Sequence, residues 1–434
     1  MSTIGIGLAG FGTVGAGVYK NLAANRELLS QRAGVDMEIK RIAVRDPSKP
    51  RDIGLPAGTT TDNWQEVVDD PEVQVVVELM GGMDSARALF ERAIRAGKPV
   101  VTGNKALIAE HGLDLFKLAA EHRVPIFYEA AAAGGIPIIK AMRESFVGNH
   151  ILRMVGIING TSNFILTRMT ELGETYQEAL AEAQRLGYAE ADPTLDVNGW
   201  DAGHKAVILA SLAYGFWVAA QDIFVEGIES ITAEDIRFAH LLGYHVKHLA
   251  VIQAESREQV EVRVHPAFIP NGHVLASVNG VFNAVMVEGD VVGETLFYGR
   301  GAGQDPTASA VLADMAEAAA TVDGLKRRCL GFTPHQLYGR CKPIDEVVCQ
   351  FYLRLDVVDQ PGTLAQVANV LGSHQIGISS VIQPESHDAD SVPLVLMIHD
   401  ARTGDMNKAR ATIEALPCVK SVAALIRVEN SANE

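Results

Sequence analysis

The sequence predicts an α/β protein whose N-terminal part is a doubly wound parallel sheet. Two observations carry this prediction. Strand-like and helix-like segments alternate over residues 1–130, as they do in the βαβ units of a parallel sheet. A Gly-x-Gly-x-x-Gly sequence stands between a first strand, residues 4–9, and a helix expected to run to Leu29. This placement is more specific than the glycine pattern alone and predicts a Rossmann-type dinucleotide-binding domain.

Each glycine of this sequence has a physical role in holding a dinucleotide. Gly10 permits the tight turn after the strand, Gly12 lets the backbone approach a pyrophosphate, and Gly15 lets the helix pack closely on the strand. Free N–H groups at the start of the helix would bind the pyrophosphate. A glycine-rich turn without a ligand is the weaker interpretation in this context. The residues expected to bind the cofactor are Gly10, Phe11, Gly12, Thr13, Val14 and Gly15.

The end of the second strand, residues 37–44, bears on the choice of nucleotide. NAD-specific folds usually place an acid there for the ribose 2′-hydroxyl. In this chain Arg45 comes first and Asp46 second, with Lys49 and Arg51 nearby. Arg45 can pair with a 2′-phosphate, so we predict NADP(H) as the preferred cofactor. Asp46 keeps NAD(H) open as the alternative, and an exposed loop cation without a ligand is the other interpretation of Arg45.

The rest of the N-terminal sheet follows from further apolar runs. Strands are expected at residues 73–79, 99–102 and 124–128, with a helix at 85–96. Ligands of such sheets bind at the carboxyl ends of the strands. The segments expected to line the cofactor crevice are therefore 78–82, 102–105 and 129–135.

Residues 187–205 concentrate more chemistry than any other stretch. They contain Glu190, Asp192, Asp196, Asp201 and Lys205. The last two are four residues apart and share a helix face. Such a pair is usually a solvated ion pair, but the apolar continuation of this helix and the additional carboxylates favour a polar pocket.

The remainder predicts two more domains. Strand-like segments at 153–158 and 260–264 alternate with helix-like segments at 175–186 and 202–216. A second glycine-rich loop, 299–307, precedes a helix; it either returns to the nucleotide through Gly303 or is a plain turn with a helix cap. From residue 351 the pattern is βαββαβ over about 80 residues, which is typical of a ferredoxin-like domain. The expected domains are a nucleotide-binding domain at 1–135 completed by a helix near 303–322, an α+β substrate-binding and oligomerisation domain at 136–302, a linker at 323–348, and the ferredoxin-like domain at 349–434.

The composition limits the classes of partner. The 434 residues are 48% hydrophobic and 21% charged, with a net charge of −16. This balance provides no basic surface for nucleic acid. The longest apolar run, 206–220, is short for a membrane span and carries Ser211 and Tyr214. The sequence lacks a signal-peptide pattern before the first strand and has no Cys-x-x-Cys pair, so we expect a cytoplasmic protein with reduced thiols.

Three motifs carry a family resemblance: Asn-Gly-Thr-Ser-Asn at 159–163, the stretch 187–205, and the loop 299–307. Through them, and over essentially its whole length, the chain resembles the monofunctional bacterial homoserine dehydrogenases, which carry a C-terminal ACT regulatory domain. The resemblance implies an oxidoreductase that catalyses reversible NAD(P)H-dependent reduction of L-aspartate 4-semialdehyde to L-homoserine. That reaction belongs to threonine, methionine and isoleucine biosynthesis.

The resemblance also implies roles for individual residues. Lys205 corresponds to the acid/base lysine, and Lys105 to a second catalytic lysine near nicotinamide and substrate. Glu190 corresponds to the residue that binds the substrate ammonium and Asp201 to one that orients its reacting end; Asp196 either contacts substrate or shapes the loop. These roles agree with the chemistry, because a zwitterion needs acceptors and a developing alkoxide needs a proton donor.

A structural sodium ion is implied by the same resemblance. Its ligands would be backbone carbonyls and one carboxylate, a donor set that suits a hard cation. The corresponding positions are Glu129, Ala132, Gly134 and Ile136.

Two other functions remain open at this stage. One is an NADP-dependent dehydrogenase of another small amino acid aldehyde, against which the constellation from Glu190 to Lys205 argues. The other is a non-catalytic sensor of NADP(H) and amino acids, against which the presence of both Lys105 and Lys205 argues. The ferredoxin-like domain is expected to bind L-threonine as a feedback effector in a homodimer or homotetramer, or else to serve oligomerisation alone.

Overall fold

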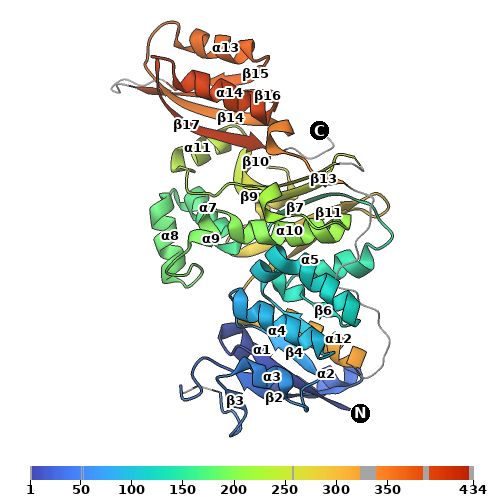
Figure 1. Ribbon diagram of the computed structural model, residues 1–434. Coiled ribbons are helices and arrows are strands. Elements are labelled where there is room, and N and C mark those ends of the chain that lie inside the picture. The colour runs from blue at the N-terminus through green and yellow to red at the C-terminus, as the bar shows by residue number, and fades with distance from the viewer. Residues whose placement is uncertain are drawn as a thin grey trace. The chain divides into compact units, whose positions relative to one another are not determined.

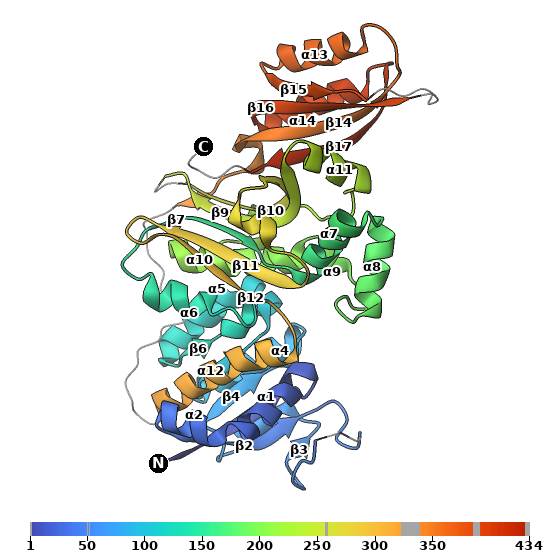
Figure 2. The ribbon, with the colours of Figure 1, turned by 180° about the vertical axis from the view of Figure 1, so that it is seen from behind.

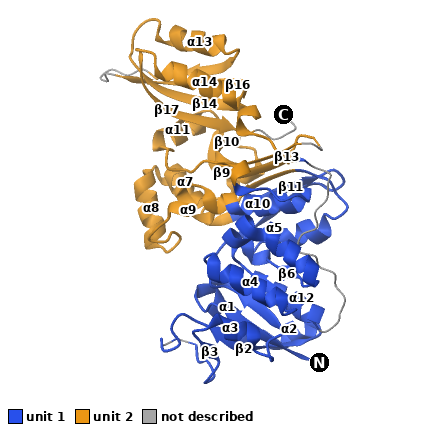
Figure 3. Cartoon of the chain, in the orientation of Figure 1, with its two compact units in different colours: residues 1–152, 204–220, 283–339 blue, residues 153–203, 221–282, 340–434 orange. Residues whose placement is uncertain are grey.

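The computed structural model describes residues 2–49, 51, 53–256, 259–322, 339–384 and 391–429. The chain forms two compact units that are interleaved in sequence (Figure 3). Unit 1 contains residues 1–152, 204–220 and 283–339, and unit 2 contains residues 153–203, 221–282 and 340–434. The predicted linker at 323–348 lies outside the described residues up to position 338.

Unit 1 is built on a parallel sheet with the strand order β3-β2-β1-β4-β5-β6. This is the order of a doubly wound nucleotide-binding sheet, so the predicted fold class is confirmed. The strands are β1 (Thr3–Ala9), β2 (Asp36–Ala43), β3 (Thr60–Thr61), β4 (Val75–Glu78), β5 (Val100–Thr102) and β6 (Ile126–Phe127). All residues of β4 and β5 are buried, because helices cover both faces of the sheet.

The helices of unit 1 are divided between the two faces of this sheet. One face carries α3, α4 and α5 (Figure 1), and the other carries α1, α2 and α12 (Figure 2). Their bounds are α1 (Thr13–Ala24), α2 (Arg26–Ala33), α3 (Trp64–Asp69), α4 (Asp84–Arg95), α5 (Lys105–His122) and α12 (Gln304–Val322). The smaller elements of unit 1 are η1 (Glu129–Ala131), α6 (Ile138–Lys140), η2 (Ala141–Ser145) and the neighbouring strands β11 (Phe282–Gly289) and β12 (Gly293–Arg300).

The helix expected to reach Leu29 is in fact two helices. α1 ends at Ala24, and α2 begins at Arg26. Asn25, between them, leaves the helical conformation (φ −114°, ψ 17°), and its Nδ2 donates to the carbonyl of Asn21 at 3.1 Å. Asparagine side chains compete for helix carbonyls in this way, which breaks a helix that hydrophobic periodicity alone would continue.

Unit 2 has a mixed sheet with the strand order β7-β9-β10-β17-β14-β16-β15, and β8 and β13 also pair with β10. Its strands are β7 (Ile151–Ile157), β8 (Phe224–Val225), β9 (Tyr244–Ala254), β10 (Gln259–Pro270), β13 (Arg340–Cys341), β14 (Val348–Val357), β15 (Ile378–Ile382), β16 (Val392–Arg402) and β17 (Val419–Val428). Its helices are α7 (Gly160–Leu172), α8 (Tyr176–Arg185), α9 (Thr194–Val197), α11 (Ala233–Leu241), α13 (Thr363–Ser373) and α14 (Thr403–Glu414), with the short η3 (Ala220–Asp222), η4 (Val274–Ser277) and η5 (Ile344–Glu346). α10 (Trp200–Tyr214) begins in unit 2 and continues in unit 1.

The last part of the chain confirms the predicted βαββαβ order. β14, α13, β15, β16, α14 and β17 follow one another, and the four strands form an antiparallel sheet around a core of their own. β17 also pairs with β10, in parallel, at Ala267–Arg427 and Phe268–Val428. The sheet of this domain is therefore continuous with the rest of the unit 2 sheet.

A buried ion pair ties the C-terminal domain to α11. Arg354 on β14 donates from Nε to Oδ1 of Asp235 at 2.6 Å, and both side chains are at most 5% exposed. The hydroxyl of Tyr352 donates to the same oxygen at 3.2 Å. Asp235 also accepts from the N–H and hydroxyl of Thr232, which closes the capping box of α11.

We expect Asp235→Asn to destabilise unit 2 by about 3 kcal/mol, because removing one partner of a buried ion pair leaves the other charge uncompensated. In calorimetry, the transition assigned to this unit should fall by about 6 °C or more. Asp69→Asn is the matched control. The carboxylate of Asp69 accepts hydrogen bonds from Nε and Nη2 of Arg92 at 2.7 and 2.6 Å, but both side chains are about half exposed. The control should cost less than about 1 kcal/mol. Equal losses from the two substitutions would contradict this account.

None of the helices in the described part of the chain combines the length and the apolar character that a membrane span requires.

Candidate active site

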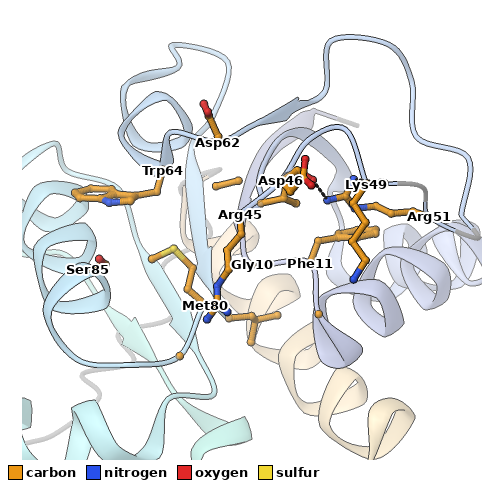
Figure 4. A pocket seen from close by; sticks show the side chains of 15 residues that line it. Gly10, Phe11, Arg45, Asp46, Lys49, Arg51, Asp62, Trp64, Met80 and Ser85 are labelled. Carbon is orange, nitrogen blue, oxygen red and sulfur yellow. Dashed lines mark hydrogen bonds between the residues drawn. The ribbon is translucent and has the colours of Figure 1, made fainter.

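A cavity of about 540 Å³ lies at the carboxyl ends of β1, β2 and β4 in unit 1. Figure 4 shows Arg45 between Trp64 and Met80 on one side and Phe11 and Lys49 on the other. The residues that line it are Gly10, Phe11, Gly12, Ala43, Val44, Arg45, Asp46, Lys49, Arg51, Asp62, Trp64, Leu79, Met80, Gly81 and Ser85. Of the three crevice segments expected from the sequence, 78–82 contributes to this lining. Trp64 was not expected there, because its short helix leaves no distinct pattern.

The three glycines of the first turn have different surroundings. Gly10 has a φ of +104°, and a Cβ there would lie 2.3 Å from the carbonyl oxygen of Leu79. A Cβ on Gly15 would lie 2.3 Å from the carbonyl oxygen of Gly10. A Cβ on Gly12 would meet no atom within 4 Å. Gly10 and Gly15 are therefore required by the fold, whereas Gly12 leaves open space beside the cavity.

A buried carboxylate holds the loop after β4, which lines this cavity. Oε1 of Glu78 accepts the backbone N–H groups of Met80 and Gly81 at 2.8 and 3.1 Å, and Oε2 accepts the hydroxyl of Thr102 at 2.8 Å. Burial raises the pKa of Glu78 above its ordinary value, and these hydrogen bonds oppose that shift. The side chain of Glu78 thus fixes the loop after β4, a role that the sequence of segment 78–82 does not reveal.

The charged residues after β2 are not equivalent. Arg51 donates to the backbone carbonyls of Lys49 and Asp46, each at 2.8 Å. Oδ1 of Asp46 accepts the N–H and the hydroxyl of Ser48 at 2.9 and 2.6 Å, and these bonds lower the pKa of Asp46. Arg45 is exposed at the cavity. The guanidinium of Arg45 is therefore exposed at the cavity, and one oxygen of Asp46, Oδ1, is engaged by Ser48.

Lys105 and Lys205 both belong to unit 1. Lys105 is the first residue of α5, whose cap is Asn104: Oδ1 of Asn104 accepts the N–H of Leu107 at 3.2 Å, and Nδ2 donates to the carbonyl of Gly82 at 2.8 Å. Lys205 is buried in α10, at 8% exposure.

The helices that carry these two lysines approach each other in unit 1. His204, next to Lys205, places Nε2 4.0 Å from Oε1 of Glu110 on α5. The indole N–H of Trp217 donates to the carbonyl of Ala109 at 3.3 Å. Glu110 is about 7.5 Å along the helix axis from Lys105, at 1.5 Å per residue.

The carboxylates Asp196 and Asp201 belong to unit 2, and one amide joins them. Nδ2 of Asn159 donates to Oδ1 of Asp196 at 2.8 Å and to Oδ2 of Asp201 at 2.7 Å. Glu190 is exposed on the same loop. Asp192 is exposed as well, and its Oδ1 accepts the N–H and hydroxyl of Thr194 at 3.2 and 2.5 Å, so this carboxylate shapes the local turn. Asn159 belongs to the motif at 159–163, but the sequence carries no signal for its role.

The loop proposed for a cation turns through two unusual residues. Ala133 and Gly134 both have positive φ, at 55° and 45°. The carboxylate of Glu129 accepts the N–H groups of Ile139 and Lys140 at 3.0 and 2.8 Å, so its two oxygens are engaged at the start of α6. The N–H of Glu129 donates to Asp314 at 2.7 Å.

Burial raises the pKa of Glu129 to about 7 and that of Asp314 to about 8. Lys140 opposes both shifts, and its ammonium lies 3.8 Å from Asp314. In the described part of the chain, no group of three or more His, Cys, Asp or Glu side chains is placed to hold a metal.

The second glycine-rich loop reaches the first turn of α1. Gly303 has a φ of +121°, and the next residue, Gln304, donates from Nε2 to the carbonyl of Thr13 at 2.9 Å. A Cβ on Gly17 would lie 2.7 Å from Cγ of Gln304, so α1 and α12 approach closely there.

The fold and this cavity define the class of the protein as one with a Rossmann-type dinucleotide-binding domain. Comparison with known proteins is more specific. The family model described as "Homoserine dehydrogenase" matches residues 137–316, its NAD-binding domain matches residues 10–129, and the ACT domain matches residues 351–418.

Individual relatives agree with the family models. A homoserine dehydrogenase of Pseudomonas aeruginosa is 46% identical over 434 residues, covering 99% of each chain. The crystal structure of one from Thiobacillus denitrificans has a TM-score of 0.92 and 43% identity, again over 99% of each chain. A hyperthermophilic archaeal homoserine dehydrogenase in complex with NADPH has a TM-score of 0.62 and 30% identity over 73% of this chain and 97% of its own.

The chain belongs to the homoserine dehydrogenase family. It is an oxidoreductase, and its reaction is the nicotinamide-dependent interconversion of L-aspartate 4-semialdehyde and L-homoserine. The expectation from the resemblance is confirmed, and the two other functions considered above are not favoured.

The space around Gly12 and Gly15 predicts that alanine has different effects at the two positions. Gly12→Ala should fold with a melting temperature close to that of the unchanged protein, because the new Cβ meets open space. It should weaken nucleotide binding by about tenfold or more, because the methyl group occupies the room that a pyrophosphate needs. Titration of NADPH by fluorescence measures this effect.

Gly15→Ala is the matched control. Its Cβ would collide with the backbone at Gly10, so it should lower the melting temperature by several degrees. If Gly12→Ala bound NADPH as tightly as the unchanged protein, the open space at Gly12 would not be the nucleotide site.

Proposed function

We propose that Lys205 is the general acid and base of this reaction and that Lys105 acts as a second catalytic lysine. Bound nicotinamide supplies and accepts the hydride. In the reducing direction Lys205 gives a proton to the carbonyl oxygen of the semialdehyde, and in the other direction it takes a proton from the homoserine hydroxyl. The observation that supports this assignment is the burial of Lys205 on α10, four residues after the buried Asp201.

The carboxylates of the loop and of α10 are proposed to bind the amino acid part of the substrate. Glu190, exposed and without burial cost, binds the substrate ammonium. Asp201 orients the reacting end, and Asp196 contributes beside it, because Asn159 holds these two carboxylates together. Acceptors of this kind recognise a zwitterion and leave a simple aldehyde poorly bound.

The cofactor is proposed to be NADP(H) in preference to NAD(H). Arg45 is available at the cavity, whereas the carboxylate of Asp46 already accepts two hydrogen bonds from Ser48. The archaeal relative described above was solved with NADPH. Gly10, Phe11 and Gly12 would hold the pyrophosphate, with Thr13, Val14 and Gly15 at the start of α1, and Lys105 and Gly303 would complete the cofactor contacts.

A sodium ion is proposed at the carbonyl oxygens of Glu129, Ala132, Gly134 and Ile136. Two successive positive φ angles turn the carbonyls of this loop, and hydrogen bonds to α6 occupy the carboxylate of Glu129, which favours carbonyl ligands. A crystal structure in sodium buffer without density among these oxygens would remove this assignment.

Regulation and assembly complete the proposal. The ACT domain is proposed to bind L-threonine, the end product of the pathway, in a homodimer or homotetramer.

β12 would provide a self-association surface in unit 1, because Leu296 and Tyr298 on it are 41% and 55% exposed. Light scattering that gave the mass of one chain would rule out the oligomer. We place the enzyme in the cytoplasm, where NADPH is available. We also propose that the domains expected from the sequence have separate roles: the first binds the cofactor, the second binds the substrate, and the ferredoxin-like domain regulates the enzyme.

Lys205→Ala should lower kcat by about 10²- to 10⁴-fold, the range for loss of a general acid, while circular dichroism stays unchanged. The assay follows NADPH oxidation by aspartate semialdehyde. Lys105→Ala should also lower the rate. Lys117→Ala, at an exposed position of α5, is the control and should keep full activity. An intact rate for Lys205→Ala would refute its role as the acid.

Arg45→Asp should raise the KM for NADPH by about 10- to 100-fold, because it removes charge-assisted hydrogen bonds worth about 1.5–3 kcal/mol. The KM for NADH should change little. Arg32→Asp makes the same change of charge at an exposed position of α2 and should leave both constants unaltered. An unchanged ratio of the two KM values in Arg45→Asp would exclude Arg45 from the choice of nucleotide.

L-Threonine at millimolar concentration should slow the reaction and raise the melting temperature, since a ligand that binds the folded state stabilises it. D-Threonine is the control for nonspecific effects of an amino acid. If L-threonine changed neither quantity, the C-terminal domain would be assigned to assembly alone.

A further inference from the structure

The side chain of Asn159 makes three hydrogen bonds within unit 2. It is 4% exposed and lies at the N-cap of α7. Its Oδ1 accepts the backbone N–H of Ser162 at 2.7 Å. This bond fixes the orientation of the amide, because only an oxygen can accept it, and the Nδ2 group must then face Asp196 and Asp201.

The two N–H bonds of that Nδ2 group go to two different carboxylates. One reaches Oδ1 of Asp196 at 2.8 Å and the other Oδ2 of Asp201 at 2.7 Å. Two carboxylates that share one neighbour repel each other, and hydrogen bonds to their charged forms offset this repulsion. A side chain needs two donors and one acceptor to make all three bonds, and an amide has them.

Thr161 and Ser162, in the first turn of α7, hold the same loop. The hydroxyl of Thr161 donates to the carbonyl of Tyr188 at 2.8 Å, and the hydroxyl of Ser162 donates to the carbonyl of Asp196 at 2.8 Å. The start of α7 is therefore hydrogen-bonded to the loop 188–196 at both of its ends. Glu190 lies between these two attachment points.

We propose that Asn159 is a positioning residue for the reaction, which keeps the carboxylates of Asp196 and Asp201 ionised and in register for the ammonium-bearing substrate. It acts through these carboxylates and not on the reacting atoms. The proposal rests on the substrate-binding roles proposed above for Asp196 and Asp201.

The test exploits the double role of the side chain. Asn159→Ser keeps a good N-cap for α7 but removes the amide that reaches the carboxylates. We expect the KM for L-homoserine to rise by about 10- to 100-fold, while the KM for NADP⁺ stays within about twofold, as for loss of one or two charge-assisted hydrogen bonds in the substrate site. The acidic limb of the kcat/KM profile should move to higher pH, because the ionised carboxylates lose their donors.

Asn63→Ser is the matched control. Asn63 caps α3 by accepting the N–H of Gln65 at 3.0 Å and lies in unit 1. Asn63→Ser should keep the KM for L-homoserine and the pH profile of the unchanged protein. Asn159→Ser should lower the melting temperature more than Asn63→Ser, because it also takes a donor from two carboxylates.

A second variant keeps the proposal testable if Asn159→Ser does not fold. Asn159→Asp retains the cap and the shape but adds a third carboxylate beside the other two. Its activity should be low at neutral pH and should recover toward lower pH as the added group is protonated. An activity equal to that of the unchanged protein at every pH would overturn the proposal.

Asp196→Asn and Asp201→Asn separate this inference from the roles on which it rests. If both leave the KM for L-homoserine unchanged, the proposed roles of the two aspartates fail, and this inference fails with them. If they raise that KM while Asn159→Ser does not, only the inference about Asn159 is overturned. A combined Asn159→Ser and Asp201→Asn variant should lose less than the product of the single losses, because both changes break the same bond.

Discussion

A carboxylate or an amide that leaves water must recover its hydrogen bonds inside the protein, and this requirement holds the working loops of the enzyme in place. Glu78 holds the loop after β4, and Glu129 holds the start of α6. Asp235 holds both the first turn of α11 and Arg354 of the C-terminal domain. In each case a buried polar group is satisfied by a neighbouring segment, so the same bond that makes burial tolerable also orders the loop.

The nucleotide cavity divides this work between backbone and side chains. The backbone around Gly10 and Gly15 is packed so closely that neither position has room for a Cβ. The loop after β2 uses side chains: Arg51 is bound to loop carbonyls and Asp46 to Ser48, and Arg45 lines the cavity beside them. Close backbone packing therefore fixes the turn after β1, and side-chain hydrogen bonds fix the loop after β2.

The C-terminal domain is joined to its own unit through strand pairing and through one buried ion pair. β17 continues the unit 2 sheet beyond β10, and Arg354 on β14 reaches α11. Phe268 on β10 and Tyr352 on β14 pack with ring centroids 4.7 Å apart. These contacts join the C-terminal domain directly to β10 and α11.

The sequence by itself determined the nucleotide-binding sheet, the ferredoxin-like domain and the family, because glycine spacing, strand alternation and linear motifs are local signals. It did not show that Asn25 breaks the first helix, that β9 pairs with a β10 extending to Pro270, or that β10 pairs with β17. Nor did the sequence show the role of Asn159, although this residue belongs to the motif at 159–163. Hydrogen bonds between Asn159 and residues 37 and 42 positions away depend on how the chain folds back. Sequence periodicity carries no record of that distance, so only the tertiary structure decided which carboxylates share a donor.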